Sequence, residues 1–157
     1  MPDVVLIEPE ILQNTGNIGR TCVATNSKLW LVRPFGFELT DKYLRRAGLD
    51  YWEHLDYEII DSLDETLTRF QNRQLWLFSK KATNLYTQVK YAHDDLLVFG
   101  RETFGIPENL LAARPDDALQ IPIAPAFRSL NLATAVAIGC YEAVRQLGLP
   151  SSETEGI

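Results

Sequence analysis

The chain has 157 residues, of which 46% are hydrophobic and 23% charged, as in an ordinary globular domain with a full core. No apolar run is long enough for a membrane-spanning helix, and the first residues lack the pattern of a signal peptide. A formal net charge of −6 disfavours a nucleic-acid partner, since phosphate binding usually requires a basic surface. We therefore expect a single domain over residues 1–157, with a frayed tail over 151–157 and no membrane partner.

The basic residues are clustered, which weakens the objection from net charge. They gather in one predicted helix and in loops: Arg33, Lys42, Arg45, Arg46, Lys80 and Lys81. Many acidic residues lie in other loops or in the tail: Asp94, Asp95, Asp116, Asp117, Glu153 and Glu155. A dimer would double the basic clusters on one face of the molecule.

Short apolar runs predict buried parallel strands, and they alternate with segments of helical periodicity. The predicted strands span residues 3–7, 28–32, 57–60, 75–78, 96–99 and 118–121. Helices are predicted after an Asn14 cap, from an Asp41 cap to Gly48, from a Ser62 cap to Phe70, and over 108–113. This alternation indicates an α/β fold with an open, mostly parallel sheet and helices on both faces.

The segment Gln120–Gln146 combines a strand end, a polar loop and a long helix. Pro122 and Pro125 prevent the strand from continuing, because proline has no backbone N–H to donate. After the loop, residues at helical spacing predict one buried face: Ala133, Val136, Ala137, Cys140 and Val144. The other side carries Leu132, Ala135 and Ile138, so we expect a partner subunit to cover it. Taken alone, the segment is also explained by a proline-edged loop before a core helix.

The cysteines and histidines give no metal-binding pattern. Cys22 and Cys140 fall on predicted helix faces without ligand spacing around them, and His54 and His93 are isolated. We therefore predict two reduced core thiols in a cytoplasmic protein, and no metal site.

Two glycines mark the loop that follows the predicted strand at 96–99. Gly100 and Gly105 lack a Cβ, so the loop can adopt a left-handed backbone and approach a flat ligand closely. The segment matches neither the G-x-G-x-x-G fingerprint nor the P-loop, which disfavours NAD and ATP. A tight turn without a ligand is the alternative interpretation.

Asn17 and Arg20 lie one helical turn apart, so their side chains are neighbours. An amide beside a guanidinium suits recognition of a ribose and its phosphate, because arginine offers planar, bidentate donors. A solvated helix face with a surface salt bridge explains the same two residues.

Three blocks, in this order, resemble the three motifs of the SPOUT (SpoU–TrmD) RNA methyltransferases, of the small stand-alone TrmL/YibK-like type. They are NTGNIGR at 14–20, FGRETFGIP at 99–107 and the segment Gln120–Gln146. The resemblance extends from Ile7 to about Pro150. It implies a homodimeric tRNA 2′-O-methyltransferase that uses S-adenosylmethionine without a metal. The implied target is the wobble nucleotide 34 (cytidine or modified uridine) of leucine tRNAs, with no DNA partner and no separate RNA-binding domain.

The resemblance also implies a deep trefoil knot in the C-terminal half, whose loops form the cofactor pocket. Nothing in the sequence pattern itself predicts a knot. The implied cofactor-binding residues are Phe78, Gly100, Gly105, Ile121, Ser129 and Leu130, with Phe78 in place of a smaller aliphatic residue. The implied catalytic residues are Arg20, Ser129, Asn131 and Tyr141, and the implied RNA-binding residues are Asn17, Arg20, Arg45 and Arg46.

The implied roles have physical reasons and alternatives. A guanidinium stays protonated, so we expect Arg20 to hold a phosphate and stabilise negative charge rather than act as a base. Ser129 or Asn131 could instead cap the following helix, and Tyr141 could pack in the core. We expect Glu102 to organise its loop.

Two other functions stay open at this point. The first keeps the fold and cofactor but moves the target to another tRNA site or to ribosomal RNA. The second is a knotted RNA-binding module without catalysis.

Overall fold

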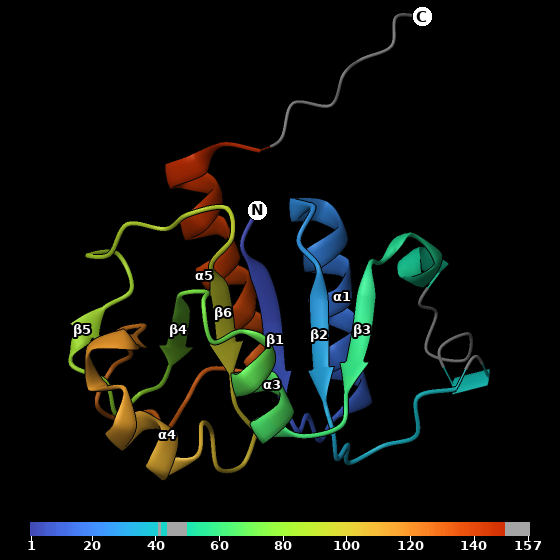
Figure 1. Cartoon of the computed structure of the whole chain (residues 1–157), viewed down its shortest axis with the longest axis horizontal. Helices are drawn as coiled ribbons and strands as arrows, with labels where there is room; N and C mark the ends of the chain where they lie inside the picture. Colours follow the sequence, from blue (N-terminus) through green and yellow to red (C-terminus); the bar gives the residue numbers. More distant parts are fainter. Residues whose placement is uncertain (41, 44–49, 150–157) are drawn as a thin grey trace, which may run out of the picture.

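The computed structural model describes residues 1–40, 42–43 and 50–149. In this part of the chain, seven parallel strands form one sheet in the order β3-β2-β1-β6-β4-β7-β5 (Figure 1). The strands are β1 (Asp3–Ile7), β2 (Leu29–Val32), β3 (Tyr57–Ile60), β4 (Leu75–Phe78), β5 (Asn84–Leu85), β6 (Leu96–Phe99) and β7 (Ala118–Gln120). The helices are α1 (Leu12–Thr25), α3 (Leu63–Arg69), α4 (Glu108–Ala113) and α5 (Leu132–Leu147), with short 3₁₀ turns at Asp50–His54 and Pro115–Asp117.

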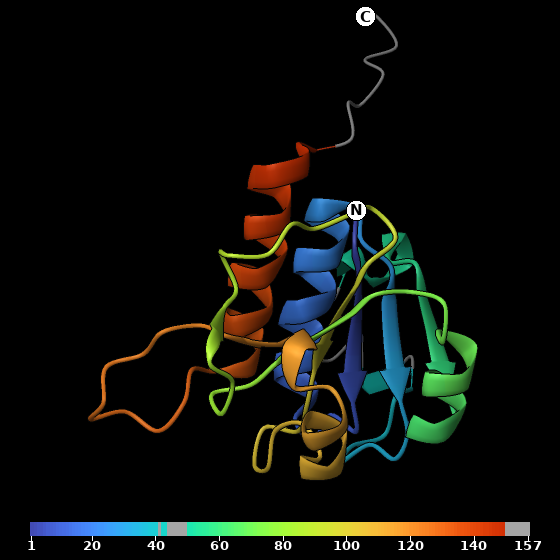
Figure 2. The same ribbon diagram turned by 60° about the vertical axis from the view of Figure 1, so that its left-hand side comes forward.

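The sheet is buried on both faces, as a parallel sheet requires. Along β1, Val4 and Leu6 join one apolar cluster, whereas Val5 and Ile7 join another. The first cluster lies under α1 and α5, which stand side by side on one face, and the second lies under α3 and α4 (Figure 2). The predicted α/β architecture with helices on both faces is confirmed.

The N-terminal cap of α1 differs from the predicted one. The helix is capped at Ile11 rather than at Asn14, and Asn14 lies buried inside the first turns. The Ile11 position offers no side-chain cap of its own; a carboxylate from a distant loop supplies the acceptor instead. By contrast, the predicted Ser62 cap is confirmed, since its hydroxyl accepts from the backbone N–H of Glu65 at 3.1 Å.

The predicted helix between Asp41 and Gly48 lies outside the described residues, apart from 42–43. The sequence pattern missed β5, because Asn84–Leu85 is too short to show alternation. The last strand also ends one residue earlier than predicted, at Gln120.

The long helix α5 packs through a face that differs from the predicted one. Val136 and Cys140 are fully buried as predicted, but Gly139 and Ala143 complete the buried stripe. A Cβ added at Gly139 would lie 3.0 Å from Cζ of Phe78 and 3.3 Å from Cζ of Phe99. The glycine therefore lets α5 approach the rings at the ends of β4 and β6, which rotates the other predicted positions to half-buried sites.

The two cysteines are buried, free thiols, as predicted. Burial raises the pKa of Cys140 to about 12 and also raises that of Cys22, so both stay protonated at neutral pH. No helix in the described part of the chain is long and apolar enough to cross a membrane. The trefoil knot stays a prediction, because strand order and register do not define how the chain threads.

Candidate active site at the carboxyl edge of the sheet

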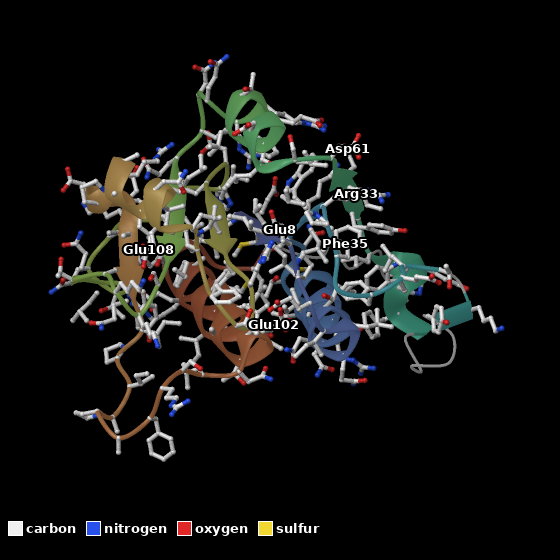
Figure 3. All side chains as sticks on the ribbon, turned by 90° about the horizontal axis from the view of Figure 1, so that it is seen from below. Glu8, Arg33, Phe35, Asp61, Glu102 and Glu108 are labelled. Carbon is white, nitrogen blue, oxygen red and sulfur yellow. The ribbon has the colours of Figure 1, made fainter. Side chains whose placement is uncertain are left out.

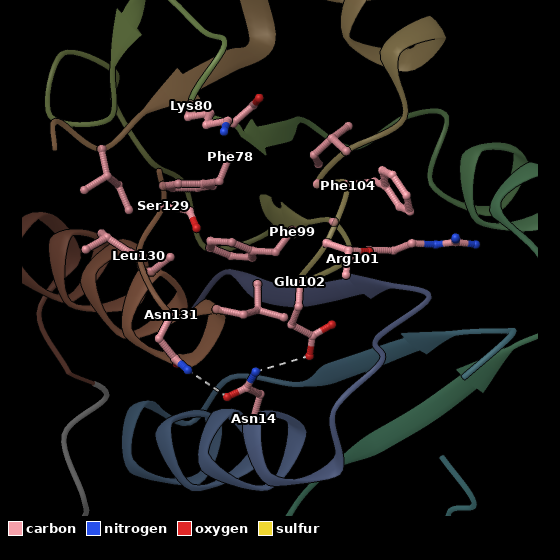
Figure 4. Close-up of a pocket in the computed structure, with 18 of the residues that line it drawn as sticks. Asn14, Phe78, Lys80, Phe99, Arg101, Glu102, Phe104, Ser129, Leu130 and Asn131 are labelled. Atoms are coloured by element: carbon pink, nitrogen blue, oxygen red, sulfur yellow. Dashed lines mark hydrogen bonds between the residues drawn. The ribbon is translucent and has the colours of Figure 1, made fainter. Parts of the chain in front are cut away.

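A cavity of about 390 Å³ opens where β4, β6 and β7 end. Because the strands are parallel, their carboxyl ends share one edge of the sheet, which is where open α/β folds bind ligands. The wall is completed by the loop after β6 and by the start of α5 (Figure 4). The volume lies in the range of small-molecule and cofactor sites.

The six predicted cofactor-binding residues all line this cavity: Phe78, Gly100, Gly105, Ile121, Ser129 and Leu130. Two aromatic rings form part of its wall, because Phe78 stacks on Phe99 with centroids 4.6 Å apart and planes 18° apart. Aromatic and aliphatic walls with a few polar groups suit a ligand that carries a flat heterocycle.

The glycines in the loop after β6 have different structural roles. A Cβ on Gly100 would lie 1.9 Å from the carbonyl carbon of Gly105, so only glycine fits at position 100. Gly105 has open space around it but a φ of +69°, in the left-handed region that favours glycine. Paired backbone hydrogen bonds between Arg101 and Gly105, at 2.8 and 3.2 Å, close the loop on itself. The left-handed backbone predicted for this loop is confirmed at Gly105, whereas the close approach at Gly100 is to the backbone of Gly105, and approach of a ligand stays a prediction.

This loop is fastened to the segment between β1 and α1 by reciprocal bonds. The carboxylate of Glu102 accepts from the backbone N–H groups of Glu10, at 2.8 Å, and Ile11, at 3.1 Å. In return, the carboxylate of Glu10 accepts from the backbone N–H of Thr103 at 3.0 Å. Arg101 forms an ion pair with Glu8. Glu102 therefore organises its loop, as expected from the sequence, and also caps α1.

A chain of amide and carboxylate groups joins the three sequence blocks (Figure 4). Asn14 donates to Glu102 at 3.3 Å and accepts from the side-chain amide of Asn131 at 2.9 Å. The oxygen of Asn131 caps α5 by accepting from the backbone N–H of Ala133 at 2.9 Å. Asn131 therefore caps α5, and both Asn131 and Ser129 line the cavity.

We expect Glu102→Gln to destabilise the chain by about 1–2 kcal/mol and to weaken cofactor binding, because the amide has one acceptor oxygen where the carboxylate has two. One backbone N–H at the start of α1 then faces an amide NH₂ group. Urea unfolding and calorimetry measure the two effects. The matched control is Glu38→Gln, an exposed carboxylate in the loop after β2, which removes the same charge. Equal behaviour of the two variants would refute the capping role.

Three predicted catalytic or RNA-binding residues lie outside the cavity lining. Arg20 is exposed on α1, with its guanidinium 4.7 Å from the ring centroid of Tyr51. It follows Asn14 by six residues, so it lies about 9 Å along the helix and roughly 120° around it. Asn17 is also exposed on α1, and Tyr141 is 51% exposed on α5 rather than packed in the core. Arg45 and Arg46 lie outside the described residues.

Some basic residues at the carboxyl edge lie beside acidic ones; Glu108, Arg33 and Asp61 are labelled in Figure 3. Lys81 forms an ion pair with Glu108, and this hydrogen bond lowers the pKa of Glu108 below its ordinary value. Lys80 donates to the backbone carbonyl of Arg128 at 3.2 Å. At the far side of the edge, Arg33 lies 3.5 Å from Asp61. The carboxylates of Glu108 and Asp61 therefore offset part of the positive charge that Lys81 and Arg33 bring to this edge.

Sequence reasoning missed several residues that line the cavity. Asn14 was expected only as a helix cap, and Ile11 and Phe104 were not considered. Phe104 is 80% exposed, an unusual position for a phenylalanine, and its place inside the FGRETFGIP block was the available signal.

The cavity fits S-adenosylmethionine in its chemistry. The apolar walls at Phe78, Ile121 and Leu130 suit the adenine, and Gly100 also lines the cavity. Ser129 offers a hydroxyl. Within residues 1–40, 42–43 and 50–149, no three His, Cys, Asp or Glu side chains are grouped as metal ligands.

The fold and the cavity define an α/β protein with a cofactor-sized site at the carboxyl edge of a parallel sheet. The chain belongs to the SpoU rRNA methylase family, whose model matches residues 2–141. The resemblance to SPOUT methyltransferases is thus confirmed.

Relatives with named activities cover nearly the whole chain. A tRNA (cytidine(34)-2′-O)-methyltransferase from Saccharophagus degradans is 44% identical over 98% of this chain and 100% of its own length. The enzyme of the same name from Yersinia pestis is 44% identical over 97% of this chain and 98% of its own.

Solved structures show the same fold. A Bacillus anthracis protein, 42% identical, matches with a TM-score of 0.93 over 99% of both chains. A structure that addresses the 2-OH methylation of C/U34 on tRNA is 42% identical, with a TM-score of 0.87 over 94% of this chain and 96% of its own. An AdoMet-bound rRNA methyltransferase from Sinorhizobium meliloti is 25% identical, with a TM-score of 0.79 over 93% of this chain and 56% of its own.

Proposed function

We propose that this chain transfers a methyl group from S-adenosylmethionine to the ribose 2′-hydroxyl of the wobble nucleotide 34 in tRNA. The observation that carries the proposal is the convergence of all six predicted cofactor-binding residues on one cavity at the carboxyl edge. Similarity to two tRNA (cytidine(34)-2′-O)-methyltransferases over nearly their full lengths supports the choice of substrate. The proposed substrates are the leucine tRNA isoacceptors, and the proposed location of the protein is the cytoplasm.

The protein's contribution is positioning rather than covalent catalysis. S-adenosylmethionine, when bound, supplies a methyl group that is already activated by its sulfonium. The protein must then hold the ribose oxygen in line with that group, and such alignment can supply roughly 7–11 kcal/mol. Ser129, on the cavity wall, orients the ribose, while Asn131 fixes the loop that carries Ser129 through its bonds to Asn14 and α5.

Arg20 enters the proposed site from a second subunit. It binds the phosphate beside the target ribose and stabilises negative charge that develops on the 2′-oxygen. Within one chain it lies on α1 outside the cavity, so a composite site in a homodimer reconciles its proposed role with its position. Asn17, Arg20 and Tyr141 are exposed on α1 and α5, the two helices that lie side by side on one face of the sheet (Figure 2), and the proposed partner contacts this layer.

The direct test combines the purified protein with tRNA transcripts, ribosomal RNA and DNA, followed by mass spectrometry of nucleosides. We expect 2′-O-methylation of nucleotide 34 in leucine tRNAs, and activity that survives EDTA. Methylation elsewhere in tRNA or only in ribosomal RNA would refute the proposed target. Cofactor binding without any methylation would indicate a binding module.

Reversing the charge of Arg45 and Arg46 to glutamate is expected to weaken tRNA binding roughly 10- to 100-fold, because each basic contact releases counterions from RNA. Filter binding at several salt concentrations measures the affinity, and the salt dependence should become shallower in the double variant. Each single reversal is compared with Lys90→Glu, at an exposed lysine outside the cavity lining, as the control for an equal change of net charge. Binding that ignores both the substitution and the salt would point to a small-molecule substrate.

A further inference from the structure

The loop after β6 exposes one aromatic ring at the rim of the cavity. Phe104 lines the cavity and is 80% exposed, so most of its side chain faces solvent. Figure 4 shows its ring on the side of the cavity opposite Ser129 and Leu130. A side chain placed there meets whatever molecule approaches the bound cofactor.

The neighbours of Phe104 hold it in that position. Arg101 pairs with Glu8, and the carboxylate of Glu102 accepts from the backbone at the start of α1. Thr103 donates to the carboxylate of Glu10 through its backbone N–H, at 3.0 Å, and through its hydroxyl, at 2.9 Å. Three consecutive side chains are thus directed back to the protein, and the fourth is held out by a loop that is closed on itself.

The surroundings of the ring identify the kind of partner. The cavity that Phe104 borders is lined by polar side chains such as Lys80, Arg101 and Ser129 as well as by apolar ones such as Ile11. An exposed aromatic ring at such a mixed rim fits a planar, polar heterocycle, because a nucleobase stacks on an aromatic face and keeps its edges in water.

We propose that Phe104 is the stacking platform for the base of the nucleotide that is methylated. This inference rests on the proposed function, since a ribose placed at the cavity carries its base within reach of the rim. Stacking there turns the ribose toward the cavity without reading the base edge. The platform therefore accepts cytidine and uridine alike and contributes to binding more than to the chemical step.

Steady-state methylation of tRNA by Phe104→Ala, Phe104→Leu and Phe104→Tyr tests the platform. Alanine and leucine should raise the KM for tRNA roughly tenfold, because both lack a ring, whereas tyrosine should stay within about twofold of the wild type. The dissociation constant for S-adenosylmethionine and the salt dependence of tRNA binding should not change, since stacking releases no counterions. The matched control is Phe127→Ala, at a phenylalanine that is 71% exposed but absent from the cavity lining.

A fluorescent readout reports stacking directly. Pyrrolocytidine in place of nucleotide 34 should be quenched on binding to the wild type and to Phe104→Tyr, but not to Phe104→Ala. An unchanged KM in Phe104→Ala, or a leucine variant equal to the wild type, overturns the platform. A parallel loss of cofactor affinity would make Phe104 a cofactor lid instead. Wild-type protein that leaves nucleotide 34 unmethylated refutes the proposed function itself, whereas an active wild type with an active Phe104→Ala refutes only this inference.

Discussion

Gly100→Ala is expected to abolish binding of S-adenosylmethionine while most of the chain stays folded. The added methyl group would lie 1.9 Å from the carbonyl carbon of Gly105 and 2.2 Å from the backbone nitrogen of Ile106. Both are backbone atoms, so no side-chain rotation relieves the clash, and the loop has to move away from the cavity. Calorimetry should show at least a roughly 100-fold loss of affinity, since a displaced loop removes one wall of the site.

Two other glycines separate this clash from simple backbone strain. Gly105 and Gly148 have φ values of +69° and +75°, and both have open space where a Cβ would be added. Alanine at either position should therefore cost about 1 kcal/mol of stability through left-handed strain. Only Gly105→Ala should also weaken the cofactor, because Gly148 ends α5 far along the chain from the cavity lining. Normal affinity in Gly100→Ala would remove the loop from the binding site.

The sequence predicted the sheet well because its central strands are short, continuous apolar runs. Such runs at 3–7, 75–78 and 96–99 are typical of strands that are buried between two layers of helices. The predicted cap of α1 was wrong, because a residue far along the chain supplies the cap instead of a local side chain. Asparagine is a common helix cap, which is why Asn14 was predicted to begin the helix. In the structure, Glu102, 88 positions further on, supplies the cap, and Asn14 lies in the interior.

The candidate site was predictable in its members but not in its connections. The glycines indicated a tight loop, yet the contact between Gly100 and Gly105 depends on how the loop closes. Gly139 on α5 packs against Phe78 at the end of β4. Sequence periodicity does not predict which helix packs against which strand, so this contact could not be foreseen. The position of Arg20 outside the cavity likewise depends on the tertiary structure. This position is the reason for proposing a dimer in which Arg20 serves the site of the other subunit.

Arg20→Ala is expected to abolish methylation while leaving cofactor affinity and dimerisation intact. The guanidinium is the group that we propose binds the phosphate of the target nucleotide, and removing such a charge-assisted contact leaves the cofactor cavity untouched. Arg20→Lys should recover only part of the activity, because an ammonium lacks the planar pair of donors. Urea unfolding checks that loss of the contact with Tyr51 does not explain the result.

Mixing Arg20→Ala with Gly100→Ala tests whether one site is built from two subunits. In a mixed dimer, the Arg20→Ala subunit keeps its cofactor cavity and the Gly100→Ala subunit provides an intact Arg20. One of the two composite sites is then complete, so a random mixture should recover roughly a quarter of wild-type activity, although each variant alone is inactive. Purification through two different affinity tags yields mixed dimers alone, which should reach about half. Mixed dimers that form and stay inactive, or an active monomer in the ultracentrifuge, would show that each chain works by itself and would require Arg20 to act within its own subunit.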